Sequence, residues 1–162
     1  MKTGLMMGVN FIVERKDDLD VLFSHEFFHA YQDDKIEGST GQTMATPVWF
    51  EGFVTYVSGV LNPDRKDTVL LMDSTLAREC DKPTFIKDIA KQYLAVIDTD
   101  GQTTYEDWFM MSGPTQPTRR GYCLGLHVMR NLIKTFTPAE TVKWDEARFS
   151  TEIKSVLQEM IK

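Results

Sequence analysis

FSHEFFHAYQ, residues 23–32, decides the expected architecture, because it places two histidines four residues apart in a helix-forming stretch. A helix turns about 100° per residue, so a four-residue step returns to nearly the same face. His25 and His29 therefore present both imidazoles to one side, and Glu26 directly follows the first of them. This arrangement indicates either a metal site or two core histidines that are satisfied by hydrogen bonds.

The helix that carries this stretch is expected to run to about Gln32. Asp17 and Asp18 offer N-cap side chains and place negative charge at the positive end of the helix. A polar loop rich in Gly, Ser and Thr follows. It ends at Thr46 and Pro47, a capping residue and a proline suited to the first helical position, so a second helix is expected to begin at Pro47.

The remainder of the chain is expected to be mostly helical, with one strand before the first helix. Leu5–Glu14 alternates loosely and ends in Phe-Ile-Val, which favours a strand. Thr137 and Glu140 fit a capping box. Further helices are expected over residues 68–80, 84–97, 104–112, 117–136 and 138–161. The large apolar residues expected in the core are Phe27, Phe28, Trp49, Phe53, Trp108 and Trp144.

Composition is that of one globular domain, with 42% hydrophobic and 26% charged residues among 162. We therefore expect a single α+β, predominantly helical domain over residues 1–162, without a membrane-spanning segment. The site candidate begins close to Met1, which suggests the C-terminal part of a longer protein. The sequence as written lacks the order of regions in a signal peptide, so a cytoplasmic location is expected.

The charge balance argues against nucleic acid as a partner. The formal net charge is -6, whereas a duplex binder needs a basic stripe to neutralise phosphates. Cys80 and Cys123 are far apart and lack the CxxC spacing of a zinc knuckle or a redox pair. They are interpreted as buried thiols, and a single disulfide stays open as the alternative. The sequence gives no indication of the oligomeric state.

Glu51 is the candidate for a third metal ligand. His25-Glu26-Phe27-Phe28-His29 matches HExxH, in which two neutral imidazoles bind zinc, and a catalytic zinc takes three protein ligands. Glu51 follows His29 by 22 residues, which lets the second helix fold back across the first. It lies among apolar residues, where a carboxylate needs a partner. That partner is either a divalent ion, with Zn²⁺ expected, or an arginine.

This set of residues indicates hydrolysis of an amide. Zinc lowers the pKa of a bound water to roughly 7, and Glu26 can accept its proton as general base. A donor to the oxyanion is also needed, and the candidates are Tyr122, Tyr56 and His127. Tyr122 is preferred, because Gly121 and nearby prolines mark a bent loop of the kind that often presents functional side chains.

At these points the sequence resembles the gluzincin metallopeptidases. It is most similar to a bacterial family of uncharacterised, predicted zinc-dependent proteases, whose pattern is an HExxH helix, a Trp-x-x-Glu-Gly-like helix and a later Gly-Tyr-x-x-Gly helix. The matching positions here are His25–His29, Trp49 with Glu51-Gly52 and Tyr56, and Gly121–Gly125. The resemblance implies a zincin-like domain that cleaves peptides or proteins, with zinc on His25, His29 and Glu51 and with Glu26 catalytic.

Two departures from the family pattern keep a second function open. Thermolysin-type gluzincins carry an acidic residue four positions after the ligand glutamate, where it orients a histidine, and this chain has Thr55 there. The family also has a sheet before the site helix, of which only Leu5–Glu14 is a candidate. The alternative is a non-catalytic zinc-binding or interaction module, and a metal-free helical domain is a third reading.

Overall fold

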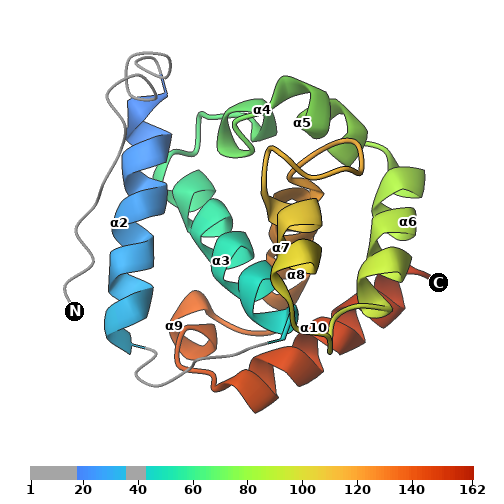
Figure 1. Cartoon of the computed structure of the whole chain (residues 1–162). Helices are drawn as coiled ribbons and strands as arrows, with labels where there is room; N and C mark the ends of the chain where they lie inside the picture. The colour runs from blue at the N-terminus through green and yellow to red at the C-terminus, as the bar shows by residue number, and fades with distance from the viewer. Residues whose placement is uncertain (1–17, 36–42) are drawn as a thin grey trace.

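The computed structural model describes residues 18–35 and 43–162, which form helices and no strand (Figure 1). None of the described helices is long and apolar enough to cross a bilayer. The predominantly helical prediction is thus confirmed for these residues, and the predicted strand Leu5–Glu14 lies outside them. The helices are α2 (Leu19–Lys35), α3 (Ala45–Leu61), α4 (Asp67–Leu70), α5 (Ser74–Cys80), α6 (Pro83–Leu94), α7 (Gln102–Phe109), α8 (Arg120–Leu132), α9 (Pro138–Thr141) and α10 (Glu146–Met160).

Helices α3 and α8 cross at the centre of the molecule and make the most extensive contact between any two helices. Helix α2 packs on the outer side of α3, and α10 runs along one end beneath α3, α6 and α8 (Figure 1). The crossing depends on two glycines: a Cβ on Gly52 would lie 2.6 Å from the carbonyl oxygen of Gly125. Since any side chain would push the helices apart, both positions require glycine.

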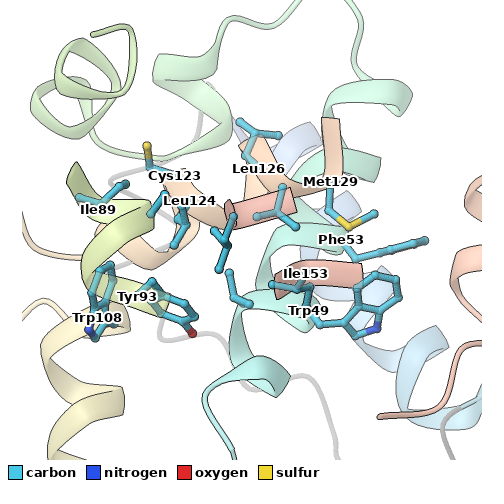
Figure 2. Packing of buried hydrophobic residues seen from close by; sticks show 14 of the residues in the cluster. Trp49, Phe53, Ile89, Tyr93, Trp108, Cys123, Leu124, Leu126, Met129 and Ile153 are labelled. Carbon is cyan, nitrogen blue, oxygen red and sulfur yellow. The ribbon is translucent and has the colours of Figure 1, made fainter. Parts of the chain in front are cut away.

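The core packs aromatic and aliphatic side chains of several helices against one another (Figure 2). Trp49 of α3 is fully buried and lies 5.3 Å, centroid to centroid, from Phe149, with the two rings nearly parallel. Trp49 also stacks on Trp144, with ring centroids 5.5 Å apart. Phe53 and Trp108 are also buried, whereas Phe28 and Trp144 pack against the core while partly exposed.

Phe27 corrects the expected core. Its side chain is 76% exposed, so the prediction that it is buried is wrong. Phe23 and Tyr31, four residues to either side, are exposed as well, which makes one face of α2 an apolar stripe. The physical reason is that α2 packs on α3 with the opposite face, the one that carries His25.

The start of α3 also differs from the expected one. The helix begins at Ala45 rather than Pro47, and Met44 precedes it without a side-chain cap. The backbone N–H of Met44 donates to the carbonyl of Thr99 at 2.9 Å, and that of Ala45 donates to Ile97 at 3.1 Å. These long-range bonds give partners to two N–H groups at the start of the helix that have no acceptor within it.

Two predicted long helices are each divided in the structure. The stretch 68–80 breaks before Asp73, whose carboxylate accepts the N–H groups that open α5. The stretch 138–161 breaks before Asp145, which accepts from the N–H of Arg148 at the start of α10. The predicted capping box at Thr137 is confirmed.

Candidate metal centre

The pairing of α2 with α3 brings His25, His29 and Glu51 together, and we call this group the histidine–glutamate cluster. Oε2 of Glu51 lies 3.3 Å from Nε2 of His25 and 3.4 Å from Nε2 of His29. The two imidazole rings meet edge to face, with centroids 4.9 Å apart. One ligand atom from each residue lies within 4.8 Å of the others, as three ligands of one ion require.

The cluster is buried and incompletely satisfied. The side chain of His25 is 7% exposed and that of Glu51 is 15% exposed. Oε2 of Glu51 is close to both imidazoles, yet this buried oxygen has no hydrogen-bond partner among residues 18–35 and 43–162. A cation between the three side chains would supply the missing interaction. Two histidines and one glutamate are a ligand set found in catalytic zinc sites, so these residues fit zinc.

The electrostatics of Glu51 suit a metal ligand. Burial by itself raises the pKa of the Glu51 carboxyl, but the imidazoles of His25 and His29 outweigh burial and lower the pKa to about 2. The carboxylate is therefore charged at neutral pH. That is the form in which a glutamate coordinates a cation.

A pocket of about 580 Å³ opens beside the cluster. His29 and Glu51 line it, together with Phe50 of α3 and Tyr105 of α7. A ligand in this pocket can thus reach two of the three metal-ligand candidates. Glu26, the expected general base, lies next to His25 on α2 and is partly exposed. The arrangement leaves room for a substrate on the open side of the cluster.

Tyr122, the preferred oxyanion donor, lies near the cluster because α3 and α8 approach closely at Gly52 and Gly125. Gly52 follows Glu51 on α3 and contacts Gly125, which lies three residues after Tyr122 on α8. The ring of Tyr122 is 6.3 Å from that of His25, centroid to centroid. Burial, and after it the charge of Glu51, raises the pKa of the Tyr122 hydroxyl well above its usual value, so the group is a neutral donor.

Arg119 holds the other face of this tyrosine. Its guanidinium lies 4.2 Å from the centre of the Tyr122 ring, within the range of a cation–π contact. The same side chain donates to the backbone carbonyl of Leu71 at 3.4 Å. The Arg119 backbone is left-handed, with φ 59°, at the position just before α8. Tyr122 therefore has neighbours both in the histidine–glutamate cluster, through His25, and in the turn before α8, through Arg119.

Tyr105 is a residue of the site that sequence reasoning missed. It lines the pocket with Glu51, and its ring stacks on Phe109 at 5.4 Å. Burial raises the pKa of its hydroxyl, and the charge of Glu51 adds to the effect. Tyr105 lies in no recognisable sequence motif. It reaches the pocket only because α7 packs beside it in the folded protein, which local sequence does not indicate. The only signal available was an aromatic residue in a predicted helix.

His127 does not join the histidine–glutamate cluster. It lies with Cys80 and Cys123, and we call these three residues the cysteine–histidine cluster. The reason is helix geometry: five residues separate His127 from Tyr122 on α8, which turns it by about 140° around the helix. The geometry therefore gives no support to His127 as a donor to the oxyanion, and that role stays a prediction from the sequence. Tyr56, the other candidate, has its hydroxyl near Arg130.

The departure at Thr55 that the sequence showed is accompanied by a lack of hydrogen bonds to His25 Nδ1 among the described residues. Thr55 is fully buried on α3, one turn after Glu51, and its hydroxyl has no hydrogen-bond partner. Nδ1 of His25 is also buried without a partner. In the structure, then, His25 is oriented by packing and by Glu51 rather than by a hydrogen bond on its second nitrogen.

Comparisons of the chain with protein-family models, with curated proteins and with solved structures find no match.

Proposed function

We propose that this protein is a zinc-dependent peptidase of gluzincin type with a zincin-like fold. The observation that carries the proposal is the convergence of His25, His29 and Glu51 around a buried carboxylate oxygen that lacks a hydrogen-bond partner. The pocket beside them gives a peptide access to the site. The three sequence elements of the resemblance also meet in space, since the Gly52–Gly125 contact joins two of them.

In this proposal His25, His29 and Glu51 hold the ion. Zinc, when bound there, polarises a carbonyl and lowers the pKa of water to roughly 7. Glu26 accepts a proton from the attacking water and returns it to the leaving amine. Tyr122 donates its hydroxyl hydrogen to the developing oxyanion, and Tyr105 positions the peptide from the wall of the pocket. Peptide or protein chains are the proposed substrates.

The test begins with metal content. Protein that is purified without added zinc and kept oxidised, with the Cys80–Cys123 disulfide intact, is expected to contain about one zinc per chain, and His29→Ala is expected to lose it. His127→Ala is the matched control, because it removes a histidine from outside the cluster and should keep the zinc. Peptide cleavage is then measured with Glu26→Gln, which should retain the metal and lose activity. A chain with no zinc, and with no thermal stabilisation on adding zinc, contradicts the proposal.

A non-catalytic zinc-binding module is the second candidate. Thr55 occupies the place of an orienting acid, and Nδ1 of His25 has no hydrogen bond, an interaction that metal-ligating histidines almost always make. Coordination separates the two functions. A catalytic zinc keeps one open position that a small inhibitor such as a hydroxamate can occupy, whereas a structural zinc has four protein ligands and does not bind it.

A further inference from the structure

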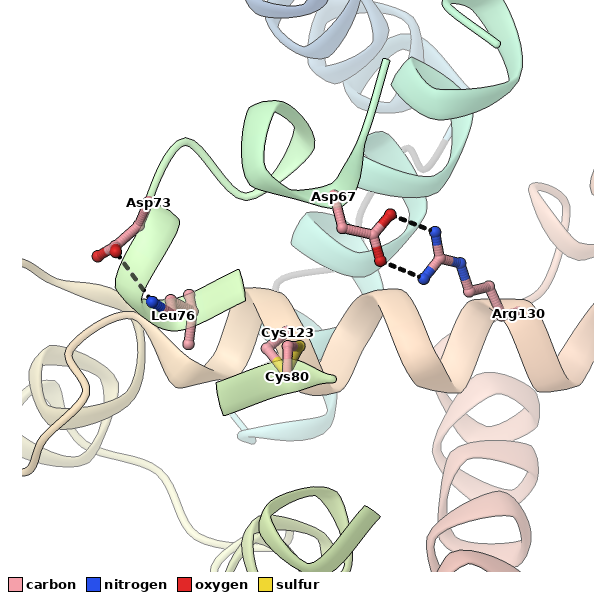
Figure 3. Close-up of a disulfide and its surroundings, with 6 residues drawn as sticks. All are labelled: Asp67, Asp73, Leu76, Cys80, Cys123 and Arg130. Atoms are coloured by element: carbon pink, nitrogen blue, oxygen red, sulfur yellow. Dashed lines mark hydrogen bonds and ion pairs between the residues drawn. A yellow bond between two sulfur atoms is a disulfide. The ribbon is translucent and has the colours of Figure 1, made fainter. Parts of the chain in front are cut away.

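The second group of interest is the cysteine–histidine cluster, on the side of α8 away from Tyr122. Cys80 at the end of α5 and Cys123 of α8 form a disulfide (Figure 3). His127 follows Cys123 by four residues, so both side chains lie on one face of α8. A ring nitrogen of His127 and both sulfur atoms lie within 4.8 Å of one another. Three metal-ligating groups are thus already assembled around the disulfide.

Burial and nearby charges both act on the pKa of His127. Burial lowers the pKa of its imidazole, and the neighbouring Arg130 guanidinium lowers it further. Asp67, Asp81 and the backbone carbonyl of Cys80 offset part of that effect. The geometry makes His127 the third ligand candidate, since one ring nitrogen lies within 4.8 Å of both sulfur atoms.

An ion can reach this cluster. A pocket of about 300 Å³ is lined by Cys80, Asp81 and His127, with Asn131 and Met160 at its other wall. Asp81 is exposed and directly follows Cys80, so its carboxylate adds negative charge at the entrance. The fourth position of a tetrahedral ion on the three ligands is open to this carboxylate or to water.

We propose that reduction of the Cys80–Cys123 disulfide creates a second metal site, with Cys80, Cys123 and His127 as ligands and zinc as the ion. A dithiol reductant transfers two electrons and two protons to the disulfide and becomes a disulfide itself. Both thiols then lose their protons as the ion binds, and zinc keeps its charge throughout. The two sulfurs separate to about 3.8 Å, as two thiolates on one tetrahedral zinc require.

The choice of zinc follows from the ligands. Two thiolates and one imidazole form a soft donor set that favours zinc over magnesium or calcium. In an oxidising compartment the disulfide is retained, whereas in a reducing compartment, such as the cytoplasm expected for this chain, the ion takes its place. Helices α5 and α8 are thus linked in both states, by the disulfide when the cysteines are oxidised and by the ion when they are reduced. This site is independent of the proposed peptidase centre, which contains no sulfur ligand.

Cobalt distinguishes the two sites, because only thiolate ligation gives a sulfur-to-cobalt charge-transfer band in the near ultraviolet. Wild-type protein is titrated with Co²⁺ before and after reduction with a phosphine, and the excess reductant is removed. Reduced protein is expected to bind one more ion per chain than oxidised protein and to show the band. A reduced wild type without the band overturns the proposal, whatever happens at the histidine–glutamate cluster.

Variants assign the ligands. The double variant Cys80→Ser with Cys123→Ser is expected to show no band after treatment with the reductant. In the reduced protein, His127→Ala should weaken Co²⁺ binding by more than the roughly 10–100-fold that loss of an outer-shell partner costs. Asn131→Ala is the matched control, since it lines the same pocket without belonging to the ligand set. Equal affinity of His127→Ala and Asn131→Ala removes His127 from the site.

Folding of the reduced chain is followed by far-ultraviolet circular dichroism. If reduction lowers the helical signal, zinc should restore it in wild-type protein and not in His127→Ala. A failure of zinc to restore the signal in the wild type also contradicts the proposal.

Discussion

The histidine–glutamate and cysteine–histidine clusters are built to one plan. In each, two ligand-type side chains lie four residues apart on a helix, and a third comes from a neighbouring helix: His25 and His29 with Glu51, and Cys123 and His127 with Cys80. Each cluster is bordered by a pocket. The difference is chemical, because two sulfurs can bond to each other while two imidazoles cannot.

Because of this difference, two side chains four residues apart on a helix can contribute either to a candidate metal site or to a covalent link. At the histidine–glutamate cluster the three ligand atoms are not bonded to one another, and two of the three residues, His29 and Glu51, line a pocket of about 580 Å³. At the cysteine–histidine cluster two of the three atoms are consumed by a covalent bond between α5 and α8. The first arrangement suits an ion that acts on a substrate, and the second suits a structural link. Five changes test this division, and they are given in order of expected effect, with the two tyrosine changes together.

Glu26→Gln is expected to have the largest effect. Removing a general base reduces kcat by roughly 10²–10⁴-fold, while both imidazoles and Glu51 remain to hold zinc. Cleavage of a peptide library and zinc content are measured together. The matched change at the other cluster, His127→Gln, should leave kcat unchanged. A Glu26→Gln protein that cleaves peptides at the wild-type rate would exclude Glu26 as the base.

Replacing both cysteines by alanine is expected to cost the next largest amount. The disulfide closes a loop with a sequence separation of 43, for which chain entropy predicts about 4 kcal/mol of stability. Urea unfolding of the oxidised wild type and of the double variant measures the difference. Zinc bound by His25, His29 and Glu51 should be unaffected. Equal unfolding midpoints would show that the bond has no structural role.

Tyr122→Phe is expected to reduce kcat by about 10²-fold, as the loss of one oxyanion donor does, with KM nearly unchanged. Tyr105→Phe should raise KM more than it lowers kcat, because Tyr105 lies in the wall of the pocket. Tyr56→Phe is the control, as its hydroxyl lies near Arg130. If Tyr105→Phe lowers kcat and Tyr122→Phe raises KM instead, Tyr105 is the oxyanion donor and Tyr122 positions the substrate.

Thr55→Val is expected to have the smallest effect. The hydroxyl of Thr55 is buried without a partner, so replacing it by a methyl group removes an unsatisfied polar atom and nothing else. Zinc affinity should be unchanged and stability equal or slightly higher. A weaker zinc affinity, measured by competition with a chelator, would reveal that Thr55 orients His25 when the ion is bound.

The sequence was sufficient for those parts of the site that depend on local spacing. The four-residue step from His25 to His29 requires only a helix, and Glu51 could be identified because a carboxylate among apolar residues needs a partner. Tyr105 and the disulfide could not be predicted, because both depend on how distant helices pack. The contact of Gly52 with Gly125 explains why a glycine follows Glu51, but only the structure shows that the two glycines meet.

For the fold, too, features that depend on local sequence were predicted, and features that depend on distant contacts were not. The capping box at Thr137 is a short-range pattern and was predicted correctly. The start of α3 was not, because its first N–H groups are satisfied by carbonyls of Ile97 and Thr99, which no local pattern indicates. Phe27 was expected in the core since it is large and apolar, yet its position on the outer face of α2 leaves it exposed.

The disulfide also determines how the chain behaves when its backbone is cut. Tyr105 and Tyr122 both lie between Cys80 and Cys123, and the loop between α7 and α8 exposes Met110 and Met111. A protease that cuts in this loop breaks the backbone between the two tyrosines, but the disulfide still joins the two fragments. The nicked protein migrates as one chain in electrophoresis without reductant and as two chains with it. Self-digestion at this loop would therefore go unseen unless the sample is reduced.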